Sequence, residues 1–169
     1  MRRLFLFFLL AWAWTAGLAS EVALPGTGLV ITVPAGWLLR TDPHGATLSF
    51  RQPNGTAGLA IVVTEPQAQG PASFAQAAYQ ELQSGATAFT VIDSGFAYAV
   101  GTLIWSHVRY RIRIGTTVWE QVTYLTVAGG RGIIITGSAA PSEIVALLPV
   151  FEQAAITAGL SRAVLPIAR

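Results

Sequence analysis

The chain has 169 residues, of which 53% are hydrophobic and 11% charged, and this composition excludes an intrinsically disordered protein. Its 10 basic residues, all of them arginines, stand against 8 acidic ones and give a formal charge of +2. Two arginines lie in an N-terminal export segment, so the remainder is formally neutral and shows no charge excess for nucleic acid. The lack of cysteine excludes disulfides, thiolate catalysis and a lipid anchor on cysteine.

The first 19 residues have the order of a secretory signal peptide. Arg2 and Arg3 supply the positive charge, and residues 4–14 form the apolar stretch. Gly17 and Ala19 are the small residues that a signal peptidase reads, so we predict cleavage after Ala19. About 150 residues then remain, the size of one domain, and they act outside the cytoplasm, in the periplasm or secreted. Retention as an uncleaved anchor and export by the twin-arginine route remain open alternatives.

The mature chain opens with a leader rich in proline and glycine, residues 20–28, and its domain is expected to span 29–160. Leu29–Val33 is a continuous apolar run, which predicts a strand buried on both faces. Pro34 ends this strand because proline lacks a backbone donor. Trp37 is expected to anchor the following turn, largely buried in the core.

The next segments predict a hairpin followed by a helix. Ala46–Arg51 and Gly58–Thr64 are strand candidates that should pair antiparallel across the turn at Asn54–Gly55. The apolar spacing of Ser73–Ser84 predicts a helix, with a capping box at its first residue. Gly85 is expected to take the left-handed conformation that stops this helix.

The following fifty residues have an almost continuous strand pattern with glycine-rich turns too short for crossovers. Consecutive strands must therefore be antiparallel neighbours. The expected strands are Phe89–Asp93, Phe96–Val100, Trp105–Ile114, Thr117–Val127 and Arg131–Thr136.

A last helix is expected from Ser142 to Ala158, with Gly159 as its stop and a kink at Pro149, whose nitrogen cannot donate. The tail 161–169 has no periodicity.

The run Ile133–Ile135, like the first strand, shows no alternation of apolar and polar residues, which is typical of a sheet covered by helices on both sides.

The most unusual polar pattern lies on one expected strand. Alternation places five residues on one face of it, and we call them the basic stripe: Trp105, His107, Arg109, Arg111 and Arg113. One interpretation is an ordinary solvated strand face, partly neutralised by Glu120 on the next strand. The other is an anion-binding or partner-docking surface, because guanidinium groups bind carboxylate or phosphate bidentately. An exposed Trp105 would favour docking.

Other chemistry finds little support in the sequence. There is no Gly-x-Ser-x-Gly motif and no dinucleotide loop, and the only histidines are His44 and His107. Asp42–His44 combines two metal-ligating residue types but is more typical of a turn. Trp37 and Trp119 are expected in the core rather than as ligand-stacking residues. We predict no catalytic, metal or cofactor site.

Two stretches carry a resemblance. Leu29–Trp37 is an apolar strand followed by Pro-x-x-Trp, and Gln121–Gly130 continues through Ile133–Thr136 into the terminal helix. They resemble the PsbP-like/DcrB-like family, which includes a photosystem II lumenal subunit and a eukaryotic Ran-binding nuclear import factor. The resemblance implies an α+β fold over about Leu29–Leu160: an α/β/α sandwich with a central, mainly antiparallel sheet flanked by helices.

The resemblance also implies a class of function, since family members act mostly as binding, assembly or chaperone-like proteins. We expect a non-enzymatic accessory protein whose partner is another envelope protein. No nucleic acid and no cofactor is expected, and only the signal peptide meets the membrane, transiently. The alternatives are a small-molecule carrier, which needs an apolar cavity between sheet and helix, and a hydrolytic enzyme with an unrecognised site.

Overall fold

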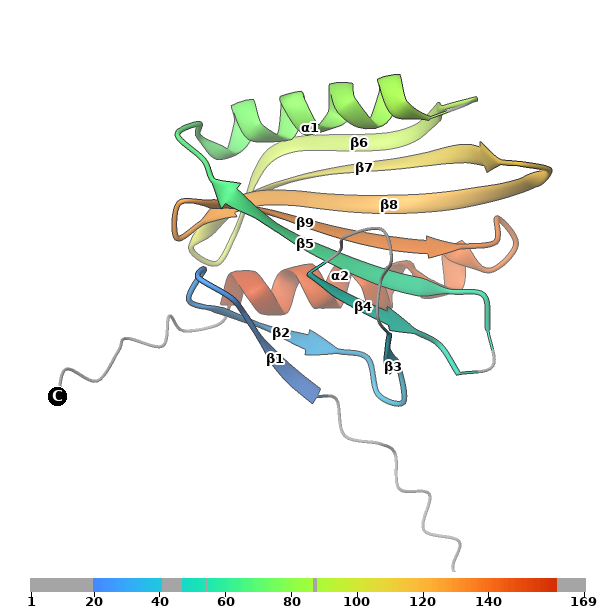
Figure 1. Cartoon of the computed structure of the whole chain (residues 1–169), viewed down its shortest axis with the longest axis horizontal. Helices are drawn as coiled ribbons and strands as arrows, with labels where there is room; N and C mark the ends of the chain where they lie inside the picture. Colours follow the sequence, from blue (N-terminus) through green and yellow to red (C-terminus); the bar gives the residue numbers. More distant parts are fainter. Residues whose placement is uncertain (1–19, 41–46, 54, 87, 161–169) are drawn as a thin grey trace, which may run out of the picture.

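The computed structural model of the chain describes residues 20–40, 47–53, 55–86 and 88–160. The strands are β1 (Ser20–Leu24), β2 (Leu29–Val33), β3 (Leu38–Arg40), β4 (Leu48–Arg51), β5 (Gly58–Pro66), β6 (Thr90–Val100), β7 (Leu103–Ile114), β8 (Thr117–Ala128) and β9 (Arg131–Ala139). The helices are α1 (Pro71–Gly85) and α2 (Ile144–Leu160). A seven-stranded antiparallel sheet lies between the two helices (Figure 1), which confirms the predicted α/β/α sandwich.

The strand order of the large sheet is β3-β4-β5-β9-β8-β7-β6. The chain makes one meander from β3 to β5, crosses through α1 to the far edge, and returns in a second meander until β9 pairs with β5. Two-residue turns join the strands of the second meander, and Gly101, Gly115 and Gly129 take positive φ in them. Such turns match the twist of antiparallel strands, as the short glycine-rich connections predicted.

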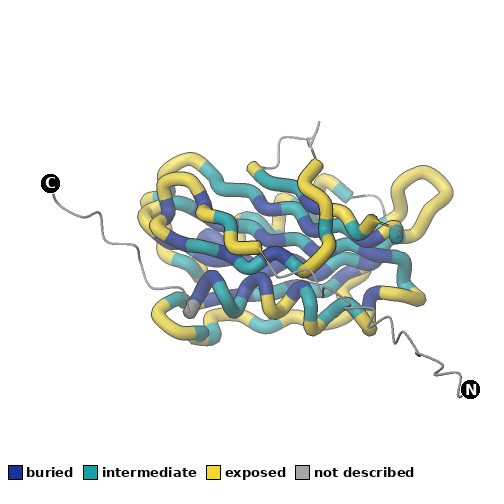
Figure 2. The backbone as a smooth tube through the Cα atoms, turned by 90° about the horizontal axis from the view of Figure 1, so that it is seen from below, coloured by how far each residue is buried: buried dark blue, intermediate teal, exposed yellow. Residues whose placement is uncertain are grey.

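The two faces of the sheet are covered differently. On one, the α1 face, α1 packs on β6, β7 and β8. On the other, the α2 face, α2 packs on β8 and β9, and also on β2 of a separate two-stranded sheet. Figure 2 shows buried residues along the strands and the inner sides of the helices. The main core lies on the α2 face, and a small cluster around Phe74 lies under α1.

Two glycines on β9 decide where the helices sit. A Cβ at Gly137 would overlap the ring of Phe151 from α2, and a Cβ at Gly132 would overlap the ring of Phe74 from α1. The aromatic rings therefore rest directly on the strand backbone, one on each face. Because close packing of this kind leaves no room for a methyl group, it fixes both helices against the central strand.

The N-terminal segment differs from the prediction. Ser20–Leu24, expected in a leader, is β1 and pairs antiparallel with β2. On β2, Leu29, Ile31 and Val33 are buried, whereas Val30 and Thr32 are only partly buried. The prediction that this strand is buried on both faces was therefore wrong. Its apolar run arises because one side packs into the core with α2 while the small β1–β2 sheet leaves the other side half-covered.

The ends of the helices also differ. The capping box at Ser73 is wrong, because α1 begins at Pro71 with Gly70 as its N-cap and makes no side-chain cap. Proline at the first helical position needs no donor, so it starts the helix instead. Gly85 is the last helical residue rather than a left-handed stop.

Helix α2 likewise passes through its expected stop at Gly159 and is continuous through Pro149. Gly159 is needed for a close approach, since a Cβ there would lie 2.7 Å from the carbonyl oxygen of Val100. No helix among the described residues is long and apolar enough to cross a membrane. The predicted signal peptide, the turn Asp42–His44 and the tail 161–169 lie outside the described residues.

Candidate functional site

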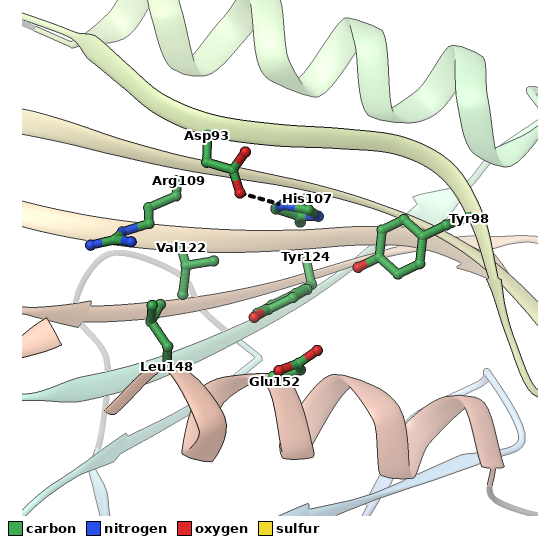
Figure 3. Close-up of a pocket in the computed structure, with 8 residues that line it drawn as sticks. All are labelled: Asp93, Tyr98, His107, Arg109, Val122, Tyr124, Leu148 and Glu152. Atoms are coloured by element: carbon green, nitrogen blue, oxygen red, sulfur yellow. Dashed lines mark hydrogen bonds and ion pairs between the residues drawn. The ribbon is translucent and has the colours of Figure 1, made fainter. Parts of the chain in front are cut away.

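A cleft of about 360 Å³ opens between α2 and strands β6, β7 and β8 (Figure 3). We call it the α2-face cleft. Its lining residues are Asp93, Tyr98, His107, Arg109, Val122, Tyr124, Leu148 and Glu152. Two of them, His107 and Arg109, belong to the basic stripe. The two ionisable residues in the middle of the stripe therefore lie in the cleft, next to α2.

Two irregularities in β6 bring its residues into the cleft. The register with β7 shifts between Val91 and Asp93, and again between Gly95 and Tyr98. Each shift adds one residue to β6, and an added residue moves the following side chains to the other face of the sheet. Asp93 consequently lies opposite Arg109, and Tyr98 lies opposite Trp105. Asp93 and Tyr98 are five residues apart, so without the bulge between Gly95 and Tyr98 their side chains would lie on opposite faces of the sheet.

His107 is held from three sides. Its Nε2 lies 3.3 Å from Oδ2 of Asp93, and its ring packs edge-on against Tyr98 with centroids 5.6 Å apart. The ring of Tyr124 lies 6.1 Å away on the neighbouring strand. Directly opposite on β6 is Gly95, where a Cβ would lie 2.7 Å from Cε1 of the imidazole. The absence of a side chain at position 95 therefore makes room for the ring.

Glu120 is a fully buried carboxylate beside the cleft and binds two arginines. The Nε of Arg109 donates to its Oε1 at 2.7 Å, and the Nε of Arg111 donates to its Oε2 at 2.8 Å. Arg111 lies directly opposite Glu120 in the β7–β8 register. A charge can be buried at this depth only when it is paired and hydrogen-bonded, and both oxygens are. The neutralisation of the stripe by Glu120, expected under the first interpretation, is present.

The basic stripe runs from core to solvent rather than along one exposed surface. Trp105 is only 1% exposed, so its assignment as a partner-binding residue was wrong. It is buried because β7 begins under the C-terminal end of α2, where its indole lies close to Gly159. The side chain of Arg109 is 21% exposed and that of Arg111 is 52% exposed. Arg113 is exposed and forms no ion pair with any described residue.

The two tyrosines of the cleft keep their protons. Burial, reinforced by the negative charge of Glu152, raises the pKa of Tyr98 to about 12. Burial, Glu152 and Tyr98 likewise raise the pKa of Tyr124 above its ordinary value. Figure 3 shows both phenols and Glu152 directed into the same space. The cleft therefore offers neutral hydroxyls and a guanidinium as donors, and the carboxylates of Asp93 and Glu152 as acceptors.

This mixture is suited to binding a polar group of mixed charge. The described residues contain no group of three His, Cys, Asp or Glu side chains placed to hold a metal ion. Sequence reasoning found His107 and Arg109 through alternation but missed Asp93, Tyr98, Tyr124 and Glu152. The interruption of the strand pattern around Gly95 was the only indication of the bulges in the sequence. It does not show at which positions the extra residues lie.

The other two tryptophans were expected in the core. Trp37 packs against Phe151 edge to face, with ring centroids 6.1 Å apart, but it is half-buried rather than largely buried. Trp119 is half-buried and lines a surface hollow on the α1 face. It projects beyond the part of the sheet that α1 covers, so the core prediction was wrong for this residue.

The sequence matches no protein-family profile and no curated protein. Solved structures are similar, however. The cyanobacterial PsbP (CyanoP) of Synechocystis shares 16% identity, with 88% of this chain and 96% of that chain covered and a TM-score of 0.65. LpqN of Mycobacterium tuberculosis, described as involved in cell envelope biogenesis, shares 16% identity over 78% of this chain and 79% of its own, with a TM-score of 0.55.

The Ran-binding protein Mog1p of Saccharomyces cerevisiae gives a similar result. It shares 12% identity over 83% of this chain and 94% of its own, with a TM-score of 0.56. At sequence identities this low, structural similarity shows a shared fold but does not show a shared activity. The chain therefore has the PsbP-like/DcrB-like fold that its sequence resemblance implied.

Proposed function

We propose that the protein is an exported, non-enzymatic accessory protein of the cell envelope that binds another envelope protein through the outer end of β7. Its structural neighbours support an accessory role, since they include a cyanobacterial PsbP and a protein involved in cell envelope biogenesis. The signal-peptide pattern of the first 19 residues supports export. The intact mass of the native protein tests export directly, because cleavage after Ala19 makes Ser20 the first residue.

The observation that carries the proposal is an excess of positive charge at the solvent end of the basic stripe. Arg109 and Arg111 share one carboxylate, and Arg113 adds a third guanidinium without an ion pair among the described residues. On the neighbouring strand, Val118 lies directly opposite Arg113 and is 38% exposed. Arginines next to exposed apolar side chains are typical of protein interfaces. We infer a partner surface that is acidic and partly apolar.

Photocrosslinking tests this surface in the native envelope. A photoreactive amino acid at Arg113 should capture the partner, whereas the same group at Gln83, exposed on α1, should not. The double variant Arg111→Gln/Arg113→Gln should reduce capture, mainly by slowing association, and wild-type capture should weaken as salt rises. A folded double variant that captures the same partner at the same salt would overturn the assignment.

A second candidate function, a small-molecule carrier, is favoured by a different observation. A cavity of about 560 Å³ lies between α1 and the sheet, with apolar walls that include Val62, Leu82 and Ile134. Its volume lies within the usual range of ligand sites. An apolar fluorescent probe should bind there, and Ala78→Phe should fill the cavity and abolish binding. A probe that binds the variant equally well would remove this candidate.

A further inference from the structure

A second hollow, of about 700 Å³, lies on the α1 face near the β3–β4 edge. Helix α1 packs on β6, β7 and β8, so it does not cover this part of the sheet (Figure 1). The residues that shape the hollow are Arg40, Arg51, Gly58, Trp119, Gln121 and Ser138. It lies on the opposite face of the sheet from the α2-face cleft and from Arg111, Arg113 and Val118, and Ile114 at the end of β7 also lines it.

The strand register explains why the surface is concave here. Arg51, Gly58, Ser138 and Gln121 lie opposite one another in one row across β4, β5, β9 and β8. The two central positions of the row carry the smallest side chains, and the two outer positions carry long ones. Gly58 and Ser138 therefore form a low floor, with an arginine wall on one side. The other wall is formed by Gln121 and Trp119.

The arginine wall is positively charged, and the described part of the chain gives it no ion-pair partner. Arg40 lies opposite Ser49, and Arg51 lies opposite Leu38, so the two arginines are diagonal neighbours on one face of adjacent strands. Long side chains in this arrangement can reach a common point. Both are exposed, neither forms an ion pair with a described residue, and no described carboxylate lines the hollow. The hollow is thus complementary to an anion.

The opposite wall is aromatic and is held in place by hydrogen bonds. The hydroxyl of Tyr110 donates to Oε1 of Gln121 at 2.8 Å, and Nε2 of Gln121 donates to Oγ of Ser138 at 2.9 Å. Ser138 therefore keeps its own hydroxyl proton for a ligand. Half-buried Trp119 lines the hollow beside this fixed network. An indole packs well against the C–H face of a sugar ring, while serine hydroxyls bond to sugar hydroxyls.

We propose that this hollow binds a sugar that carries a carboxylate group, such as a uronic acid unit of an acidic polysaccharide. The ring lies on the floor of Gly58 and Ser138 against Trp119, and its carboxylate lies between Arg40 and Arg51. Guanidinium groups bind a carboxylate bidentately, so the two arginines select the acidic sugar over a neutral one. The small side chains of the floor leave room for a sugar ring that longer side chains would exclude.

Calorimetric titration of the exported protein with oligogalacturonate tests the proposal. The neutral galactose oligomer of equal length should bind at least about tenfold more weakly, since a charged hydrogen bond is worth that factor or more. Arg40→Gln/Arg51→Gln should weaken oligogalacturonate binding by a similar factor. Arg111→Gln/Arg113→Gln, which removes the same charge from the other face, should leave it unchanged. Circular dichroism checks that each variant is folded.

Two further variants separate a built sugar site from simple charge attraction. Gly58→Leu fills the floor without changing charge, and Trp119→Leu removes the aromatic wall; both should abolish oligogalacturonate binding. If both folded variants bind it as the wild type does, the proposal fails. It also fails if poly-glutamate or phosphatidylglycerol vesicles bind with the same dependence on Arg40, Arg51 and Trp119, because the site then recognises a peptide or a lipid surface.

Discussion

Arginines on the two faces of the same sheet differ in what surrounds them. On the α2 face, Arg109 and Arg111 bind the two oxygens of the buried Glu120. On the α1 face, Arg40 and Arg51 line a hollow with no described carboxylate. Exposure alone does not reveal this difference, since Arg111 is 52% exposed and still engaged. An arginine is available to a ligand when no buried acid holds it.

The buried acid beside one pair explains the contrast. Strand β8 is central, with neighbours on both sides, and α2 covers its face, so Glu120 is fully buried and requires cations beside it. Arg51 on β4 and the arginines of β7 are each one strand away from an edge of the sheet, so distance from the edge does not separate them. Arg40 and Arg51 differ because no described carboxylate lines their hollow, so their long side chains can extend into water.

The largest expected effect comes from removing the buried acid. Glu120→Ala leaves two guanidinium groups without their carboxylate and creates a cavity, so the free energy of unfolding should fall by about 3–5 kcal/mol. Urea denaturation measures the change. The matched variant on the other face, Arg40→Gln/Arg51→Gln, should change it by no more than about 0.5 kcal/mol per substitution. Equal losses on both faces would contradict the contrast.

A smaller effect distinguishes the packed cleft from the open hollow. Gly95→Ala places a methyl group against the imidazole of His107, so it should cost about 1–3 kcal/mol and separate the His107 and Tyr98 rings. Gly58→Ala meets its nearest atom, a backbone oxygen of Phe50, only at 3.6 Å. It should be neutral or stabilise the fold by about 0.4–1 kcal/mol. Denaturation and ring-to-ring nuclear Overhauser contacts measure the two outcomes.

The smallest expected effect is a dependence of stability on alkaline pH that arises in the cleft. The pKa of Tyr98 is about 12 in the folded protein, against 10.0 for a free phenol. In that window the folded state keeps a proton that the unfolded state loses, so stability should fall as the pH rises from 10 to about 12. Tyr98→Phe should flatten this decline in denaturation experiments. An unchanged slope would mean that other groups cause it.

The sequence was sufficient for features that depend on local pattern. Glycine-rich two-residue turns predicted the second meander, and alternation placed His107, Arg109, Arg111 and Arg113 on one face, as the β7–β8 register confirms. These features are predictable because strand periodicity and turn chemistry act over a few residues. The doubly covered sheet also followed from runs such as Ile133–Ile135, where alternation disappears.

The sites themselves depend on relations that no local pattern records. Asp93 and Tyr98 share a face only because of the bulge between Gly95 and Tyr98, and Glu152 reaches the cleft from α2, which follows three strands later. The hollow requires that Gly58 and Ser138 fall in one row, which is set by the pairing of β5 with β9. Trp105 and Trp119 were misassigned because their burial depends on where each helix ends on the sheet.

The bulged strand β6 has a consequence for solubility. It forms an open edge of the large sheet, where Val91, Ile92 and Phe96 are exposed, and an open apolar edge invites a second chain to add a strand. The bulges interrupt the regular spacing of its backbone hydrogen-bonding groups. Ala97 also adopts a φ of 57°, which is incompatible with regular strand geometry. An incoming strand would lose its register within a few residues. The irregularity that shapes the cleft thus also protects the molecule from edge-to-edge aggregation.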